Sequence, residues 1–542
     1  MPQTTNTPLP ADAGLSSAPI EPPLLVDPSL LAALDIGTNS IRMALVRLDE
    51  KNGTWNLLST HKETVRLGQG EFASNRVSDE AIERGVLVLA KFVEVARGRG
   101  AGEIIAIATA ALREAENRDD FVRRAREETG VEVRVVPGIE EARLIYLGVA
   151  SGVDLGDKRA LFIDIGGGST ELIVGTQQEH FLLESLKLGA IRLGNRFLEG
   201  VTGPISPSLY ATMRQYARGV ASHALRKIRE TGFELAVASS GTAMNLAAVT
   251  ARRNGEEPAT IRNYTLRTAD LIQTAQMLCK LPLDERRRVP GLNPERADII
   301  ISGAAVLQTI AEELGLDGLR ISDRSLREGV LVDALRRRAS GNESRDTGVR
   351  RQSIERLTRL VPGEENHARH VARLCLRLFD QAQALGLHGY GTRERELLEY
   401  AALAHDVGIF VSHSGHHRHS YYLIRHSELA GFTDEETRVI ANLAYFHRKS
   451  VPKKRHEHFQ ELGRDDQRMV RKLSTLLRLA EGLDRSHLGL VRDVTLTLEK
   501  EHVLLTLHSD GDPRLETWYV DSECAAFEDG FGIGLSIAQR AE

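Results

Sequence analysis

Short apolar runs and longer amphipathic stretches alternate along residues 31–150. Residues 31–36 and 41–48 are apolar runs on either side of the segment 37–40, which predicts a strand, a tight turn and a returning strand. Residues 78–97 carry apolar positions at helical spacing, and Ser78 is suited to cap that helix. The other expected elements are strands near 54–60, 103–108 and 131–136 and helices at 119–129 and 140–150. Strands that alternate with helices predict a mixed α/β sheet.

The same pattern starts again near residue 161. A strand at 161–164, a turn at 166–168 and a returning strand at 170–174 are expected there. Asp, Ile, Gly and Ser occupy matching places in segments 34–40 and 163–169, so that Asp35 corresponds to Asp164 and Ser40 to Ser169 without a gap. Two such units predict a duplicated domain with a cleft between the copies.

Beyond residue 352 the pattern becomes mostly helical and rich in histidine, and two short strands are expected at 494–498 and 502–507. The segment 1–29 is rich in Pro, Ser and Thr, which is typical of a disordered tail. The expected segments are therefore a tail at 1–29, α/β subdomains at 30–150 and 151–335, a charged linker at 336–352, a helical domain at 353–490 and a small α+β segment at 491–542.

Composition narrows the class of protein. Of 542 residues, 42% are hydrophobic and 27% are charged, a balance typical of globular proteins, and no apolar run is long enough to span a membrane. The three cysteines lie far apart, which fits a reducing cytoplasm. A net charge of −5 argues against a general DNA-binding protein. The segment 1–29 contains no Arg or Lys, so neither a signal peptide nor a transit peptide is indicated.

The two glycine turns carry the clearest chemical signal. A strand that ends in Asp-x-Gly and turns through small residues exposes backbone N–H groups, which can bind phosphate oxygens. Glycine allows a ligand to approach the backbone closely, and the aspartate at the strand end can hold a metal. A plain hairpin explains either turn alone, but the matched pair favours a phosphate site.

Several stretches together resemble a known family. Residues 35–40 (DIGTNS) and 164–171 (DIGGGSTE) resemble the phosphate motifs of the actin, sugar-kinase and heat-shock-ATPase superfamily. The exact residues of these motifs are similar to those of the Ppx/GppA branch, which comprises the exopolyphosphatases and guanosine pentaphosphate phosphohydrolases. Further similar stretches follow in the family's order at 108–113, 138–148, 239–242 and 321–329. The resemblance implies a duplicated actin-like (RNase H-like) ATPase fold with an interdomain cleft, an all-α HD-like domain and a small C-terminal α+β segment.

The resemblance also implies roles for individual residues. Glu140, the first glutamate of the Glu-Glu-Ala-Arg stretch, matches the family's catalytic base, while Glu141 is expected to point elsewhere on the helix. Asp164 and Glu171 match the carboxylates that bind Mg²⁺ and orient water, with Asp35 as a symmetric third. The expected phosphate-binding residues are Asn39, Ser40, Arg113, Gly166, Gly167, Gly168, Ser169, Ser240, Gly241 and Thr242.

The helical domain carries a second set of candidate residues. His367, the pair His405-Asp406, and Asp484 resemble the metal-binding series of the HD phosphohydrolase superfamily. Imidazole and carboxylate groups suit several divalent cations. The sequence leaves open whether this set holds a second divalent metal and whether it is catalytic.

These features predict a cytoplasmic, Mg²⁺-dependent exopolyphosphatase that releases orthophosphate from the end of inorganic polyphosphate. Hydrolysis of pppGpp to ppGpp, as in the stringent response, is the alternative that the same residues could perform. A non-catalytic sensor of alarmone or polyphosphate, and a sugar or acetate kinase, are the other classes considered. A homodimer is expected from the family alone, and neither DNA nor a membrane is an expected partner.

Overall fold

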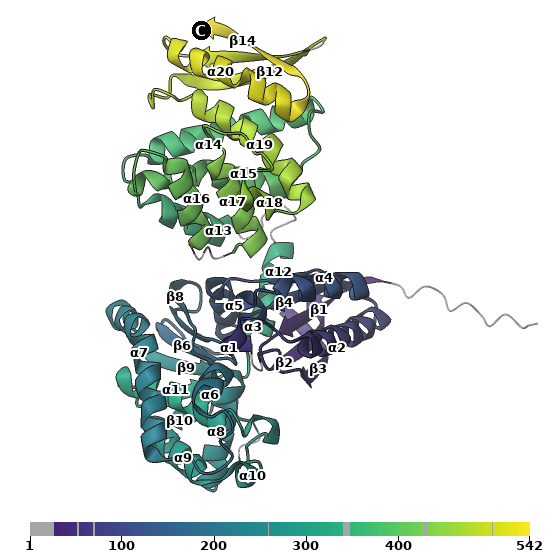
Figure 1. The fold of residues 1–542 in the computed structure, drawn as a ribbon. Coiled ribbons are helices and arrows are strands. Elements are labelled where there is room, and N and C mark those ends of the chain that lie inside the picture. The colour runs from purple at the N-terminus through teal and green to yellow at the C-terminus, as the bar shows by residue number, and fades with distance from the viewer. Residues whose placement is uncertain are drawn as a thin grey trace, which may run out of the picture.

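The structure is a computed structural model that describes residues 26–50, 54–68, 71–257, 260–339, 347–427, 429, 431–500 and 502–541. Most of the expected tail lies outside these residues, but Asp27–Ser29 differ from the expectation because they already belong to the first strand. The expected linker is also largely helical: residues 336–339 continue one helix, residues 347–352 begin the next, and 340–346 are outside the described residues. The first α/β half lies between the second half and the helical part, and the C-terminal strands with α20 lie at the far end of the helical part (Figure 1).

The first half is a five-stranded sheet in the order β3-β2-β1-β4-β5. Strands β1 to β3 pair antiparallel, whereas β1, β4 and β5 run parallel. Ser78 caps α2 as expected, because its side chain accepts a hydrogen bond from the Ala81 amide. The elements are β1 (Asp27–Ile36), β2 (Ser40–Asp49), β3 (Thr54–Thr64), α1 (Glu71–Ser74), α2 (Asp79–Gly98), β4 (Ala101–Ala108), α3 (Ala110–Glu114), α4 (Arg118–Thr129), β5 (Val133–Val135) and α5 (Gly138–Ala150).

The second half is a six-stranded sheet in the order β10-β11-β9-β6-β7-β8. Its strands and helices are β6 (Ala160–Ile165), β7 (Thr170–Gly175), β8 (His180–Leu186), α6 (Ala190–Phe197), α7 (Pro207–Thr231), β9 (Leu235–Ser239), α8 (Ser240–Arg253), β10 (Thr265–Arg267), α9 (Thr268–Lys280), α10 (Leu283–Arg286), the 3₁₀ turn η1 (Pro294–Arg296), α11 (Ile300–Glu313), β11 (Gly318–Ile321) and α12 (Leu326–Ala339).

The two sheets repeat one topology, which confirms the duplication. Strands β6, β7, β8, β9 and β11 take the places of β1, β2, β3, β4 and β5, with the same antiparallel and parallel pairings, and β10 is an addition at one edge. Helix α12 returns from the second half to pack against α5 and the first sheet. One buried cluster joins Leu31 of β1, Phe162 of β6 and Val330 of α12, so a continuous core holds the halves together.

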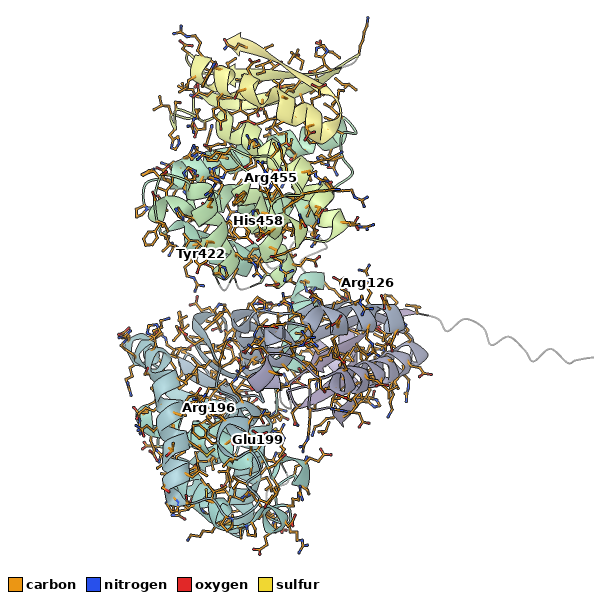
Figure 2. The ribbon with its side chains drawn as sticks, in the orientation of Figure 1. Arg126, Arg196, Glu199, Tyr422, Arg455 and His458 are labelled. Atoms are coloured by element: carbon orange, nitrogen blue, oxygen red, sulfur yellow. The ribbon has the colours of Figure 1, made fainter. Side chains whose placement is uncertain are left out.

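The helical part packs beside the first half, on the side of α12 (Figure 1). Its elements are α13 (Thr347–Thr358), α14 (Glu365–Ala384), α15 (Thr392–Ala404), the 3₁₀ turn η2 (Val407–Phe410), α16 (His416–His426), α17 (Asp434–Tyr445), α18 (Glu457–Gln460) and α19 (Arg464–Gly482). Within the histidine-rich part of the chain, α16 begins at His416. Helix α16 turns His416, His417 and Ile424 inward, whereas Tyr422 is exposed at the edge of the helical part (Figure 2).

The chain ends in a three-stranded sheet rather than the two strands expected from the sequence. Strands β12 (Val491–Glu499) and β13 (His502–Ser509) form a hairpin, and α20 (Arg514–Phe531) leads to β14 (Gly534–Ala541), which runs parallel to β13. The apolar residues of this sheet join the core of the helical part. Among the described residues, no helix combines the length and the apolar character that a membrane span requires.

Candidate functional site

The two glycine turns face each other across a small pocket between the two sheets. Each turn is closed by the same bond, from the Gly37 amide to the Ser40 carbonyl and from the Gly166 amide to the Ser169 carbonyl, at 3.1 and 3.0 Å. The pocket has a volume of about 80 Å³, and both turns line it. Such a volume holds only a few water-sized groups. The pocket can therefore enclose one end of a substrate but not a large molecule.

Glycine is required where the turns meet. A Cβ on Gly168 would lie 2.7 Å from both Phe72 Cζ and Ala110 Cβ, and one on Gly167 would lie 2.9 Å from Thr38 Cβ. These distances are shorter than any ordinary carbon contact. The close approach of the two halves therefore excludes a side chain at either position.

Three carboxylates, those of Asp35, Asp164 and Glu141, line this pocket, and a fourth, that of Glu171, lies next to them without lining it. Asp35 and Asp164 end the equivalent strands β1 and β6 and line the pocket, and Glu171 lies directly opposite Asp164 on β7. Asp164 Oδ2 accepts hydrogen bonds from the hydroxyls of Ser239 and Ser325, at 2.5 and 2.6 Å. Cross-strand partners lie on the same face of a sheet, so Asp164 and Glu171 are close neighbours.

Burial is the main influence on the pKa values of these carboxylates. It raises the pKa of Asp35 and of Asp164 above the ordinary range. Burial also raises the pKa of Glu171 strongly, and the nearby charges of Glu141 and Asp164 act in the same direction. Glu171 Oε2 makes no hydrogen bond to any residue that the structure describes. Carboxylates held this close together favour a bound cation.

The third carboxylate that lines the pocket is Glu141. This differs from the sequence-based expectation, which placed Glu140 at the site and expected Glu141 to point elsewhere. Glu141 lines the pocket between the glycine turns, and Arg113 Nη1 donates to its Oε2 at 2.7 Å. Burial raises the pKa of Glu141, while Arg113 acts in the opposite direction. Glu140 lies on another side of α5, because consecutive residues of a helix are about 100° apart.

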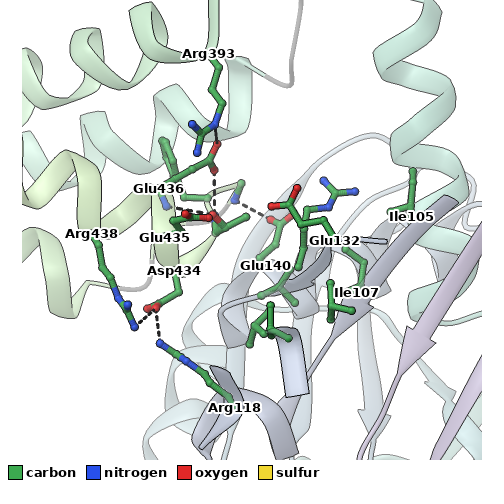
Figure 3. A pocket seen from close by; sticks show the side chains of 18 of the residues that line it. Ile105, Ile107, Arg118, Glu132, Glu140, Arg393, Asp434, Glu435, Glu436 and Arg438 are labelled. Carbon is green, nitrogen blue, oxygen red and sulfur yellow. Dashed lines mark hydrogen bonds and ion pairs between the residues drawn. The ribbon is translucent and has the colours of Figure 1, made fainter. Parts of the chain in front are cut away.

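Glu140 instead joins the first half to the helical part. Arg143 donates to both oxygens of Glu140 at 2.8 Å and to Asp333 Oδ1 at the same distance. The Gly431 amide, from the helical part, donates to Glu140 Oε2 at 2.7 Å (Figure 3). These groups lie at a separate pocket of about 490 Å³ between the two parts, which the Arg118–Asp434 ion pair also crosses at 2.6 Å.

The expected phosphate-binding residues divide into two groups. Arg113 and Thr242 do not line the pocket. The pocket is lined by the others, which are Asn39, Ser40, Gly166, Gly167, Gly168, Ser169, Ser240 and Gly241. Arg113, in the last turn of α3, donates instead to Glu141 Oε2 and to the Val136 carbonyl. The hydroxyl of Thr242 is turned to the Ile165 carbonyl, at 3.3 Å. Ser240, which lines the pocket, adopts the left-handed conformation at φ +78, an unusual backbone for serine.

Two arginines that the sequence analysis missed supply positive charge to the pocket. Arg42 lies opposite Asp35 in the β1–β2 pair, and Arg296 packs its guanidinium against the backbone of Gly241. Burial, together with the charge of Arg42, lowers the pKa of Arg296 to about 10, so it stays positive at neutral pH. The cross-strand partner of Asp35 could have been read from the hairpin register, but Arg296 lies far from both turns along the chain and carried no sequence signal.

The repeated sheet topology and the pocket between the halves place the fold in the duplicated actin-like class. The model of the Ppx/GppA phosphatase family matches residues 46–338, and the model of Ppx/GppA phosphatase domain III matches residues 349–517. The first match alone spans more than half of the chain. This chain therefore belongs to the Ppx/GppA phosphatase family, and it is a hydrolase that acts on phosphoanhydride bonds.

Solved structures agree with this assignment. An exopolyphosphatase from Cytophaga hutchinsonii is 27% identical, with a TM-score of 0.53, over 57% of this chain and 98% of that chain. An exopolyphosphatase-like protein is 26% identical, with the same TM-score and the same coverage. The Aquifex aeolicus member of the Ppx/GppA family is 24% identical, with a TM-score of 0.50 over 57% of this chain and 98% of that chain, and supports the fold.

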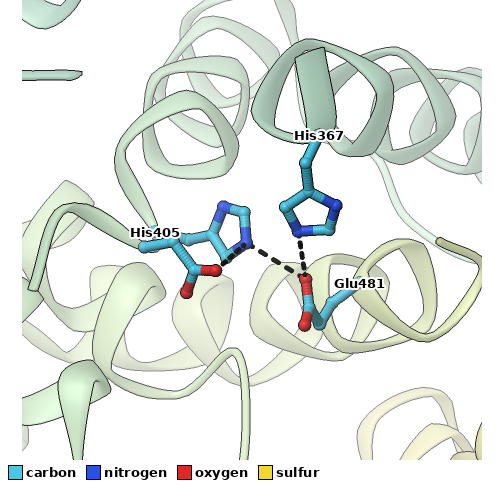
Figure 4. Close-up of side chains that lie close together, drawn as sticks. His367, His405 and Glu481 are labelled. Atoms are coloured by element: carbon cyan, nitrogen blue, oxygen red, sulfur yellow. Dashed lines mark hydrogen bonds and ion pairs between the residues drawn. The ribbon is translucent and has the colours of Figure 1, made fainter. Parts of the chain in front are cut away.

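The candidate metal residues of the helical part also lie together. His367 of α14 and His405 at the end of α15 both direct Nε2 at Glu481 Oε2, at 3.1 Å (Figure 4). Asp406 Oδ2 lies 3.6 Å from His405 Nε2. His367, His405, Asp406 and Glu481 form a buried group whose ligand atoms lie within 4.8 Å of one another.

Asp484 differs from the expectation, because it is not a member of that group. Its Oδ2 lies 2.8 Å from His367 Nδ1, and its Oδ1 accepts a hydrogen bond from the Gly489 amide at 2.8 Å. Asp484 therefore orients the His367 ring from outside the group, as carboxylates do behind metal-bound histidines. Glu481, near the end of α19, takes the place that was expected for Asp484. The Glu-x-x-Asp spacing of residues 481–484 was a signal that the sequence analysis did not use.

Proposed function

We propose that this protein is an exopolyphosphatase that uses Mg²⁺ to hydrolyse the terminal phosphoanhydride of inorganic polyphosphate. The observation that carries this proposal is the pocket between the two glycine turns, where buried carboxylates surround a space sized for the end of a substrate. The similarity to the Cytophaga hutchinsonii exopolyphosphatase, over nearly all of that chain, supports it.

Glu141 is the residue we assign as the base in this reaction. A water molecule beside its carboxylate attacks the terminal phosphorus and gives its proton to Glu141. The bond between that phosphorus and the bridging oxygen breaks, and orthophosphate and a chain shorter by one phosphate are released. Arg113 holds the Glu141 carboxylate in place through the 2.7 Å bond, so that it keeps one orientation toward the pocket.

Binding of the terminal phosphoryl group falls to the turns and to two arginines. Backbone amides of Gly167 and Gly168 and the free amide hydrogens of Asn39 Nδ2, which is buried without a partner in the described part of the chain, are available as donors. Arg42 and Arg296 offset the negative charge of the phosphoryl oxygens. These groups favour a polyanion in a pocket that otherwise carries several carboxylates.

The residues of the pocket fit Mg²⁺. Mg²⁺ prefers hard oxygen ligands, and Asp164 and Glu171, with Asp35 beside them, supply carboxylates alone. The unpartnered Oε2 of Glu171 is a buried carboxylate oxygen that remains available to a cation. When bound, Mg²⁺ would neutralise charge on the phosphoryl oxygens.

Hydrolysis of pppGpp to ppGpp is the second candidate. The two substrates share the terminal phosphoanhydride and differ in the guanosine. Among the described residues that line the pocket, none is aromatic, so no ring there is placed to stack on a base. This favours polyphosphate, although a base could remain outside a pocket of this size.

The test is phosphate release from long-chain polyphosphate and from pppGpp in parallel, with Mg²⁺ and with excess EDTA, by wild type and Asp164→Asn. We expect polyphosphate to have the larger kcat/KM, and we expect both EDTA and the substitution to remove most of the release. A larger kcat/KM for pppGpp would reverse the order of the two candidates. Full activity in EDTA would remove Mg²⁺ from the proposal.

A further inference from the structure

A second group of ligand atoms lies directly beside the first in the helical part. Asp406, His416 of α16 and His447 just after α17 are all buried, and one ligand atom from each lies within 4.8 Å of the others. Asp406 is also a member of the group that contains His367, His405 and Glu481. The two groups therefore share one carboxylate.

The hydrogen bonds of the ring nitrogens show which atoms carry protons. His447 Nδ1 lies 2.6 Å from the Ala444 carbonyl, and His416 Nδ1 lies 3.1 Å from the His413 carbonyl. A carbonyl oxygen can only accept, so each Nδ1 carries the proton, and Nε2 of each neutral ring is an unprotonated lone pair. His405 follows the same rule, since its Nδ1 lies 2.6 Å from the Ala402 carbonyl.

These lone pairs point at one another and at carboxylate oxygens. His416 Nε2 and His447 Nε2 are 3.2 Å apart, and they lie 3.0 and 3.5 Å from Asp406 Oδ1. Asp406 Oδ1 is buried and makes no hydrogen bond to any described residue. Acceptors that face acceptors repel one another in a buried site, unless a cation lies between them.

The two oxygens of Asp406 serve different groups. Oδ2 is the oxygen near His405 Nε2, at 3.6 Å, while Oδ1 is the one near His416 and His447. A carboxylate that offers one oxygen to each of two adjacent ligand groups has the form of a bridge between paired cations, which in two-metal sites are about 3.5–4 Å apart.

We propose that the helical part binds two divalent transition-metal ions bridged by Asp406. His367, His405 and Glu481 complete the first position, and His416 and His447 complete the second. Besides the bridging carboxylate, half or more of the ligands at each position are imidazole nitrogens, and this favours Mn²⁺, Fe²⁺ or Zn²⁺ over Mg²⁺. Mg²⁺ is suited instead to the all-carboxylate pocket between the glycine turns. The proposal is independent of the phosphoanhydride site.

Charge and orientation in the surroundings support this assignment. Asp406, Glu481 and Asp484 bring three carboxylates into the interior. Arg485 contacts Glu481 at 3.3 Å, but through the other oxygen, Oε1. Each of the three Nδ1–H groups bonded to a carbonyl fixes its ring with Nε2 inward, the arrangement found behind metal-bound histidines. Arg448 Nη1 lies 3.0 Å from His416 Nε2 and must turn away when a cation binds.

The experiment measures metal bound to the full-length chain. Protein produced with Mn²⁺, Fe²⁺ and Zn²⁺ in the medium is dialysed against metal-free buffer and analysed by inductively coupled plasma mass spectrometry. We expect about two transition-metal ions per chain. The double variant His416→Ala/His447→Ala should retain about half of that metal. Asp406→Ala should lose most of it, because it removes the bridge. His413→Ala, an exposed histidine of the same region, and Asp164→Asn, in the other pocket, are the controls and should keep both ions.

A second measurement keeps the proposal testable if a variant folds poorly. Wild-type protein loaded with Mn²⁺ should give the exchange-coupled electron paramagnetic resonance spectrum of two neighbouring ions, and the milder His447→Gln should convert it to that of isolated ions. One ion per chain with no effect of the His416 and His447 substitutions would overturn the second position. Folded wild type that holds no transition metal after loading would overturn the site altogether.

Discussion

Exchanging the two neighbouring glutamates of α5 for glutamine separates the roles that the structure assigns to them. Glu141→Gln keeps the shape of the side chain and an oxygen for Arg113, but removes the carboxylate that we assign as the base. Glu140→Gln makes the same chemical change one position earlier, at the contact with Arg143 and Gly431. The pair is therefore a matched test of which glutamate acts in the reaction.

The size of each effect follows from the surroundings. Loss of a general base reduces kcat about 10²–10⁴-fold, which corresponds to about 3–5.5 kcal/mol of transition-state stabilisation. KM for polyphosphate should not rise in Glu141→Gln, since the substitution removes one negative charge beside Asp35, Asp164 and Glu171. For Glu140→Gln we expect kcat within about threefold of wild type, because its side chain faces away from the pocket, and a lower unfolding midpoint from the weakened contact with Arg143.

The assay is steady-state phosphate release as a function of pH. A base must be unprotonated to accept a proton, so kcat falls as pH drops through its pKa. Burial raises the pKa of Glu141, and the acid limb should therefore lie above about pH 4.3, the ordinary value for glutamate. That limb should be absent from the residual activity of Glu141→Gln. A fully active Glu141→Gln, or a Glu140→Gln that is folded and equally inactive, would disprove the assignment.

Three further predictions concern other parts of the molecule. Gly168→Ala should lower kcat/KM by at least about tenfold, because its Cβ would lie 2.7 Å from Ala110 and force the turns apart; a fully active variant would contradict that contact. Arg296→Ala should raise KM for polyphosphate more than it lowers kcat, and Arg296→Lys should recover part of the loss; an unchanged KM would exclude Arg296 from binding. Burial alone would raise the pKa of Asp434, but Arg118 and neighbouring arginines lower that pKa below its ordinary value. The Asp434 carboxylate therefore contributes to stability above about pH 4, and this contribution is lost as the pH falls through the lowered pKa. Asp434→Asn should therefore lower the unfolding midpoint at pH 7, and its difference from wild type, followed by calorimetry, should shrink on acidification.

Local patterns in the sequence were enough to predict much of the fold. The gap-free match between segments 34–40 and 163–169 indicated the duplication, and the two sheets have matching strand orders. Ser78 was identified as a helix cap because capping depends on bonds between residues three apart. The third C-terminal strand, β14, was missed, since it pairs with β13 only after the long crossover through α20.

For the candidate sites, too, the sequence predicted some of the residues, and only the folded structure decided the others. Asp35 and Asp164 could be placed at the ends of equivalent strands beside glycine turns from the sequence, because strand, turn and carboxylate are contiguous in the chain. The choices between Glu140 and Glu141 and between Asp484 and Glu481 depended on the folded molecule. Both members of each pair are carboxylates within one turn of a helix or just beyond it, and packing of the helix against its neighbours sets which side faces the site. Spacing along a chain tells which residues share a face, but the rotation of that face toward a pocket is fixed by contacts with elements far away in sequence.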